Sequence, residues 1–201
     1  MEKKLTIPYI LSEGLALGLK NAASVIGAVV LWILTLWIPY INIGTTIAIA
    51  SLPLAISKGK VISPLQIFDK KYFKYLGEFF LLLGLMYAGI IAGMAFFIIP
   101  GLVIAIAWSL ALLLMIDKGL NPIEALTKSN QLTTGHKWTI FAAQLVVVIG
   151  IVILSVIFGL LGTFGKVLLV LVIVLIFPLL LGFEAAIYRS LAGEPQTESL
   201  D

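Results

Sequence analysis

The chain has 201 residues, of which 61% are hydrophobic and 11% charged, and its formal net charge is +3. A typical soluble domain carries charge on about a quarter of its residues, so this composition excludes an ordinary water-soluble fold. Several uncharged runs reach or approach the ~20 residues that cross the hydrocarbon core of a bilayer. The composition therefore predicts an all-α, polytopic membrane bundle.

Missing residue types and motifs exclude several functions. The basic residues form short groups beside apolar runs instead of one basic stripe, which argues against nucleic-acid binding. There is no cysteine, and the single histidine, His136, has only Asp117 and Glu124 nearby in sequence, so we expect no metal site and no cofactor. No P-loop, dinucleotide-binding glycine motif or nucleophile elbow occurs, so we expect that the protein is not an enzyme.

The first predicted unit begins with "IPYILSEGLALGLKN", whose apolar spacing predicts an amphipathic helix at the cytoplasmic interface. The apolar run that follows, from Asn21 to Ser57, would be roughly 55 Å long as one helix, which is too long for one crossing. Pro39 divides it, because proline removes a backbone donor and clashes with the preceding turn. We expect a hairpin with spans near 22–38 and 43–57.

The second predicted unit begins with "SPLQIFDKKYFKYL". Ser63 is a good N-cap and is followed by a proline at the first helical position, which predicts a surface helix from Ser63 to Leu76. Its apolar stripe consists of Leu65, Phe68, Tyr72, Phe73 and Leu76. The next apolar run is divided by Pro100 and Gly101, which predicts a hairpin with spans near 79–98 and 102–116.

The third predicted unit begins with "NPIEALTKSNQLTTGHKW", in which Asn121 is the N-cap and Ile123, Leu126 and Leu132 form a weaker stripe. The glycines of "GLLGTFGK" predict a turn between spans near 138–161 and 166–188. We therefore expect a single integral membrane domain over residues 1–201, built from three copies of an interfacial helix and a hairpin. Alternatively, the connectors lie on the membrane surface without forming a repeat.

The basic residues predict the orientation, because lysine and arginine in short loops stay on the cytoplasmic side. Only Lys166 lies on the opposite side of the six-span arrangement. The other twelve basic residues share one side: Lys3, Lys4, Lys20, Lys58, Lys60, Lys70, Lys71, Lys74, Lys118, Lys128, Lys137 and Arg189. We expect a multi-pass protein of the inner (plasma) membrane with both termini cytoplasmic.

One long stretch combines a Pro-Gly pair, an apolar span, an acidic residue and spaced small and aromatic residues. These are Pro100, Gly101, Asp117, Ala125, Ser129, Gly135, Trp138 and Phe141. With the ends "ILSEGLALGLKN" and "FPLLLGFEAAIYRSL", the pattern resembles bacterial integral-membrane families of uncharacterised function, related to the membrane domain attached to some glycerophosphodiester phosphodiesterases. The resemblance implies a stand-alone six-helix membrane domain and transfers no catalytic residue.

Polar groups inside a span need partners or water, which makes Gln144 and Glu184 candidates for an intramembrane site. Gln144 is about 9 Å past Trp138 and Glu184 about 7 Å before Arg189, so their depths match. With Ser51 and Ser109, they are predicted to line a cytoplasm-facing vestibule that accepts a lipid headgroup or a cation. Alternatively, Gln144 hydrogen-bonds a neighbouring helix and Glu184 reaches the interface.

Two further groups of residues suggest partners. Five lysines in the second connector are candidate contacts for lipid headgroups, although residues that only set the topology have the same appearance: Lys58, Lys60, Lys70, Lys71 and Lys74. Gly89 and Gly93 form a GxxxG motif that permits close helix approach, either in a homo-oligomer or within the chain.

These observations favour a non-enzymatic inner-membrane protein that acts as a lipid-associated or scaffold component, with membrane lipids as partners. The alternative is a small transporter or channel that uses Gln144 and Glu184 as its polar site. An enzyme acting on lipids is the weakest interpretation, because no matched acid, base and nucleophile are visible.

Overall fold

The computed structural model describes residues 5–193, and this part of the chain contains helices and no strand. The elements are α1 (Ile7–Thr35), α2 (Pro39–Ala50), α3 (Leu52–Ser57), the 3₁₀ helix η1 (Pro64–Phe68), α4 (Lys70–Phe73), α5 (Leu76–Phe96), α6 (Ile98–Ala107), α7 (Ala111–Lys118), α8 (Pro122–Thr133), α9 (Lys137–Leu160) and α10 (Gly162–Leu191). The all-α class is therefore confirmed. Lys3 and Lys4 lie outside the described residues.

Six helical stretches between residues 5 and 193 are long and apolar enough to cross a membrane, as the sequence predicts. They are Ile7–Thr35, Pro39–Ser57, Leu76–Phe96, Ile98–Lys118, Lys137–Leu160 and Val174–Leu191. Two of these stretches are each made of two helices, α2 with α3 and α6 with α7. This pattern is that of a multi-pass membrane protein.

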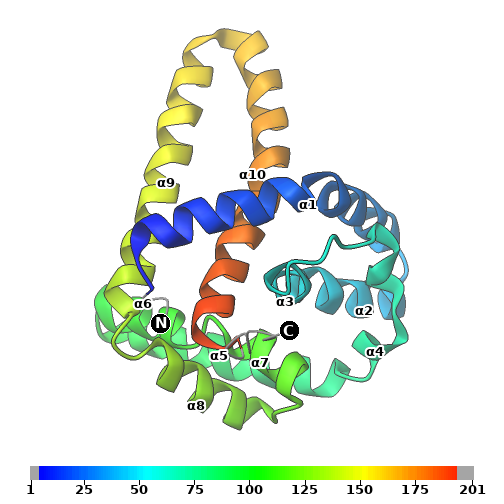
Figure 1. The fold of residues 1–201 in the computed structure, drawn as a ribbon, viewed down its shortest axis with the longest axis vertical. Helices are drawn as coiled ribbons and strands as arrows, with labels where there is room; N and C mark the ends of the chain where they lie inside the picture. The colour runs from blue at the N-terminus through cyan, green and yellow to red at the C-terminus, as the bar shows by residue number, and fades with distance from the viewer. Residues whose placement is uncertain (1–4, 194–201) are drawn as a thin grey trace, which may run out of the picture.

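The parts of α9 and α10 on either side of their connecting turn extend away from the other helices, whereas the C-terminal half of α10 runs among them (Figure 1). The turn that joins the pair lies far from the rest of the fold, and α1 crosses the pair nearer to its base. Large apolar side chains such as Val152 and Ile157 of α9 are more than half exposed. Contiguous exposed apolar surface of this kind suits contact with lipid better than contact with water.

The closest approach between α1 and α10 is made of three glycines. A Cβ atom on Gly182 of α10 would lie 2.7 Å from the amide nitrogen of Gly18 in α1, and Gly182 also contacts the carbonyl oxygen of Gly14. A Cβ atom on Gly18 would lie 2.8 Å from the carbonyl oxygen of Pro178. The two backbones can therefore touch here only because no side chain separates them.

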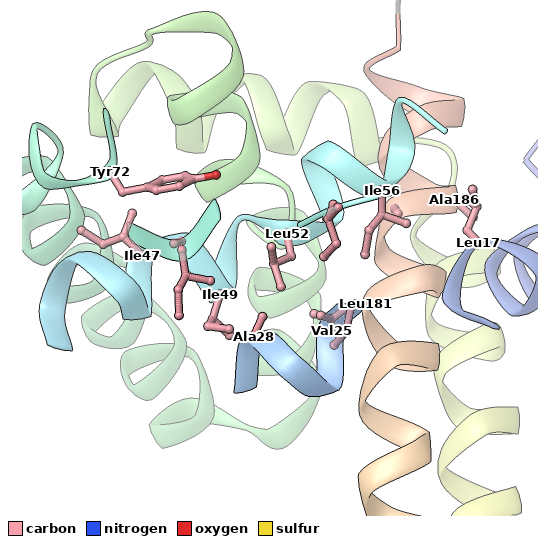
Figure 2. Packing of buried hydrophobic residues seen from close by; sticks show 14 of the residues in the cluster. Leu17, Val25, Ala28, Ile47, Ile49, Leu52, Ile56, Tyr72, Leu181 and Ala186 are labelled. Carbon is pink, nitrogen blue, oxygen red and sulfur yellow. The ribbon is translucent and has the colours of Figure 1, made fainter. Parts of the chain in front are cut away.

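The main core lies where α1, α2, α3 and α10 meet (Figure 2). Figure 2 shows Val25 and Ala28 of α1 close to Ile49 and Leu52 of the α2–α3 stretch, with Leu181 of α10 beside them. Val25, Ala28 and Leu52 are almost completely buried. Hydroxyl contacts also join α1 to α2, since the Thr35 and Thr45 hydroxyl oxygens lie 2.9 Å apart.

The helices α5 and α6 pack through the GxxxG motif of α5. The Trp108 ring lies against Gly89, and a Cβ atom on Gly93 would lie 3.0 Å from the Cα atom of Gly101. The glycine face is thus occupied within the chain, in agreement with the second of the two predicted uses. An oligomer through Gly89 and Gly93 stays a prediction.

The division between α5 and α6 differs from the prediction in one respect. The chain turns at Phe97, whose backbone is extended, and both Pro100 and Gly101 lie inside α6. Proline is tolerated there because the N–H groups of the first helical turn have no partner within the helix. Pro39, by contrast, starts α2 after α1 ends at Thr35, as expected.

The predicted surface helix from Ser63 to Leu76 is wrong as a single element. The structure has the short η1 and α4 instead, separated by Asp69 in an extended conformation. The Asp69 carboxylate accepts a hydrogen bond of 3.1 Å from the backbone N–H of Lys71, which caps α4 and lowers the pKa of that carboxyl. The stripe is divided accordingly, with Tyr72 buried and Leu65 exposed.

The other two predicted interfacial helices also differ from the expectation. The N-terminal segment is continuous with the first span as α1, since Thr6 caps the helix and nothing interrupts it before Thr35. The helix α8 is present with a full capping box between Asn121 and Glu124. Its buried face does not follow the predicted stripe, because Ile123 is exposed whereas Leu126 and the small residues on its face are buried: Ala125, Ser129 and Thr133.

Candidate functional site

A cavity of about 450 Å³ lies between α1, the α6–α7 joint, α9 and α10. Its lining consists of Ile10, Ser109, Leu110, Ala143, Gln144, Val147, Val148, Leu180, Phe183, Glu184 and Ile187. The structure therefore brings together three of the four residues that sequence depth assigned to a polar site, namely Ser109, Gln144 and Glu184. The fourth, Ser51, is buried in the α2–α3 joint and donates its hydroxyl to the carbonyl oxygen of Ala48.

The cavity has a buried floor and an exposed rim. Ile10 and Leu110 on the floor are each only 1% exposed. Val148 of α9 and Leu180 of α10 are 53% and 41% exposed. The cavity therefore opens toward the exposed apolar surface of the α9–α10 pair.

The three polar groups of the lining differ in their hydrogen bonding. The Ser109 hydroxyl donates to the carbonyl oxygen of Ile106 at 2.9 Å. Within residues 5–193, Glu184 and Gln144 make no hydrogen bond or ion pair with another residue, and Gln144 also lines a second cavity of about 250 Å³ between α6 and α9. Both side chains are thus free to interact with a bound molecule.

Two hydroxyl groups of α8 form hydrogen bonds with the helix break beside the cavity. The Ser129 hydroxyl donates to the carbonyl oxygen of Ala107 at 2.7 Å and accepts from the backbone N–H of Leu110 at 3.2 Å. The Thr133 hydroxyl is a second, longer donor to Ala107, at 3.4 Å. These bonds satisfy backbone groups that the break between α6 and α7 leaves without helical partners, and so they place Ser109 at the cavity.

A charged cluster joins the ends of α3, α7 and α10. The Asp117 carboxylate lies 2.8 Å from the Lys58 ammonium and 3.6 Å from that of Lys118. It also accepts a hydrogen bond of 2.7 Å from the Tyr188 hydroxyl. Because one carboxylate contacts all three elements, the ends of these three helices lie on the same side of the molecule.

A second ion pair joins α1 to α10 on that side. The Arg189 guanidinium lies 2.6 Å from the Glu13 carboxylate, and both side chains are about one-third exposed. Lys20 of α1 donates to the carbonyl oxygen of Gly59 at 2.9 Å. Three of the basic residues that sequence analysis assigned to one side of the membrane, Lys20, Lys58 and Arg189, therefore make side-chain contacts between different elements.

The five candidate headgroup lysines fall into two groups. Lys58 is paired with Asp117, as described above. Lys71 lies 4.9 Å from the centre of the Tyr72 ring and pairs with Asp69. Lys60, Lys70 and Lys74 have exposed side chains, so they are accessible to an anionic surface.

The residues that carry the family resemblance have different positions in the fold. Asp117 and Ser129 make the long-range contacts given above, and Gly101 packs on α5. Gly135 forms the turn before α9 with a φ of 85°, and Trp138 stacks edge-on against Phe141 at 6.1 Å. Pro100 is exposed in α6 and Ala125 is buried in α8. The set does not converge on one site.

Comparisons with known proteins add no family to this description. No protein-family model, curated protein or solved structure matches the chain. Among the described residues, no group of three or more His, Cys, Asp or Glu could hold a metal ion. The candidate site is therefore defined by the cavity and its lining residues alone.

Sequence reasoning missed several residues that shape this site. Phe183 and Ile10 line the cavity, and the α1–α10 contact depends on Gly14, Gly18 and Gly182. The "GLALG" of α1 is a GxxxG motif and could have been found in the same way as the one in α5. No local pattern indicates that Phe183 would face a cavity.

Proposed function

We propose that the protein is a non-enzymatic, lipid-associated protein of the bacterial inner membrane that holds a membrane lipid in the cavity beside Glu184. The observation that carries this proposal is the cavity itself, whose volume lies within the usual range of ligand sites. Its lining has eight apolar side chains and three polar ones, and its rim lies on an apolar surface. A lipid enters such a site from the bilayer without leaving an apolar environment.

The proposed orientation places three hairpins in the membrane with both termini and the basic connectors in the cytoplasm. The consecutive helices of each proposed hairpin contact each other. The ion pairs of Asp117 and Arg189 lie at the ends of spans, where charged groups can reach water. This arrangement also agrees with the family that the sequence resembles.

The orientation predicts that the second connector is reached only from the cytoplasm. The chain has no cysteine, so a Lys70→Cys variant carries a single thiol. We expect an impermeant maleimide to label this thiol in inside-out membrane vesicles and not in intact cells with a permeabilised outer membrane, because Lys70 is exposed on the predicted cytoplasmic side. Labelling in intact cells would reverse the proposed orientation.

The lipid site predicts that filling the cavity displaces lipid. Val147 lines the cavity, whereas its neighbour Val146 is 47% exposed and does not. In native mass spectrometry after mild detergent extraction, we expect Val147→Trp to reduce bound lipid by about tenfold, equivalent to ~1.4 kcal/mol, whereas Val146→Trp retains it. Equal lipid retention by the two folded variants would contradict the proposal.

Transport is a second candidate, favoured by the convergence of Gln144, Glu184 and Ser109 on the same cavity. Polar and ionisable groups within membrane spans often mark a substrate pathway. The two functions differ in one measurable property, because a transporter must move a solute into proteoliposomes faster than empty vesicles do. A lipid-holding protein has no such requirement.

A further inference from the structure

We propose that the cavity recognises a primary ammonium group carried on an apolar chain, with Glu184 as the opposite charge. This inference rests on the proposed lipid-associated function and adds the chemistry of the ligand. The same chemistry belongs to an amine-bearing phospholipid headgroup and to a free alkylammonium ion, and the experiment below separates these two sources.

The charge of the lining is the first argument. Of its eleven residues only Glu184 is ionisable, and none is basic. The nearest base along α10, Arg189, is paired with Glu13 at 2.6 Å, so no lining residue and no neighbouring base on this helix neutralises Glu184. A carboxylate in apolar surroundings attracts a cation strongly and repels an anionic headgroup.

The hydrogen-bonding capacity of the lining is the second argument. The proton of the Ser109 hydroxyl is directed to the carbonyl oxygen of Ile106, so this hydroxyl offers only lone pairs to the cavity. Glu184 offers carboxylate oxygens and Gln144 an amide oxygen. A primary ammonium group has three donors and no acceptor, which matches three acceptors from three elements.

The apolar part of the lining is the third argument. The walls include Val147, Val148 and Leu180, which extend from the polar groups to the exposed rim. Phe183 adds an aromatic ring to the lining, and aromatic faces attract ammonium groups. The cavity therefore suits a charged head beside Glu184 with a hydrocarbon chain directed to the bilayer.

The test compares two amphiphiles of equal chain length, dodecylammonium and dodecyl sulfate, binding to the protein in phosphatidylcholine nanodiscs. We expect the wild type to bind dodecylammonium above the level of empty nanodiscs, and Glu184→Gln to bind it at least about tenfold more weakly. Glu78→Gln is the matched control, because Glu78 is an exposed acidic residue of α5 outside the cavity, and it should bind as the wild type does. Because the Glu184 carboxylate repels an anion, dodecyl sulfate should bind Glu184→Gln at least as well as it binds the wild type, which is the opposite of the effect on dodecylammonium.

Two more variants separate loss of recognition from loss of folding. Glu184→Asp keeps the charge and should keep a preference for the ammonium over the sulfate, whereas Val147→Trp fills the cavity and should abolish binding of both. Equal binding of dodecylammonium by the wild type and Glu184→Gln, with both proteins monodisperse, would overturn the inference. If Val147→Trp still removes co-purified lipid in that case, the proposed function stands and only the ammonium preference is lost.

The source of the ammonium is decided by adding phosphatidylethanolamine to the nanodiscs. Competition with dodecylammonium on the wild type and not on Glu184→Gln identifies the lipid headgroup as the ligand. Undiminished dodecylammonium binding identifies a free amphipathic cation. Both results support the recognition of ammonium, and they assign it to different ligands.

Discussion

Gly182→Leu is expected to destabilise the protein more than any other single substitution considered for this fold. Gly182 contacts the backbone of Gly14 and Gly18 directly, so a side chain at this position meets main-chain atoms that cannot move aside without separating α1 from α10. Overpacking in a well-packed interior costs about 1–3 kcal/mol, and we expect about 3 kcal/mol or more where the obstacle is backbone. The readout is the melting temperature in fluorescence-detected size-exclusion chromatography.

Gly84→Leu is the control for this substitution. A Cβ atom on Gly84 of α5 would meet nothing within 4 Å, so the same change there adds a side chain in open space. Leucine also has the higher helix propensity, by about 0.8 kcal/mol, so this variant should melt at or slightly above the wild-type temperature. Equal melting of the two variants would show that α1 and α10 do not approach each other as closely as described.

The α1–α10 contact also determines the cavity. Ile10 on α1 and Phe183 on α10 line it, and Phe183 lies directly against Gly14 of the glycine contact. A residue that separates these helices therefore changes the distance between the floor of the cavity and Glu184. For this reason Gly182 variants are unsuitable for testing ligand recognition, and the substitutions chosen for that purpose lie on the cavity lining itself.

The number of candidate spans could be predicted because each division depends on local chemistry. Pro39 starts α2, and Gly162 adopts a φ of 64° at the turn between α9 and α10. These residues interrupt apolar runs too long for one crossing, so length and backbone preference are sufficient. The exact position of the turn before α6 was not predictable in this way, because proline is compatible with both a turn and the first turn of a helix.

The convergence of Gln144 and Glu184 could be predicted from depth, because rise per residue gives the height of a group in the membrane. Depth does not indicate toward which neighbouring helix a side chain points around the bundle axis. Ser51 has a suitable depth in the prediction, yet it lies in the α2–α3 joint away from the cavity. That direction depends on how α1, α9 and α10 pack, which only the tertiary structure specifies.

The predicted surface helix from Ser63 to Leu76 was wrong for a different reason. Apolar spacing over Ser63 to Leu76 fits one helix, but the Asp69 side chain bonds the backbone N–H of Lys71 and starts a new helix there. This bond is a local feature of the sequence, because aspartate favours helix caps over helix interiors. The interruption at Asp69 could therefore be predicted from the sequence alone. In α8 the buried small residues were left out of the predicted stripe, because a polar serine does not contribute to an apolar stripe.

The second large effect is expected for Ser129→Ala, a substitution that removes one oxygen atom from a fully buried side chain. The Ser129 hydroxyl both donates to the carbonyl oxygen of Ala107 and accepts from the N–H of Leu110, so its loss leaves two backbone groups without this partner. Each buried group left unsatisfied costs about 1–3 kcal/mol, and the 3.4 Å bond from Thr133 compensates only at Ala107. We expect a loss of about 2–4 kcal/mol in stability.

Ser155→Ala is the matched control, because the Ser155 hydroxyl bonds only the carbonyl oxygen of Ile151 within the same helix, at 2.8 Å. That carbonyl oxygen lies one helical turn before Ser155 and keeps the backbone N–H of Ser155 as a donor, so the effect should stay below about 0.5 kcal/mol. Hydrogen exchange supplies a second readout, since the Leu110 amide should lose protection in Ser129→Ala and keep it in Ser155→Ala. If α8 only rests on the α6–α7 joint, the two alanine variants will melt together and Leu110 will stay protected in both. A selective loss at Leu110 instead shows that α8 holds open the helix break that presents Ser109 to the cavity.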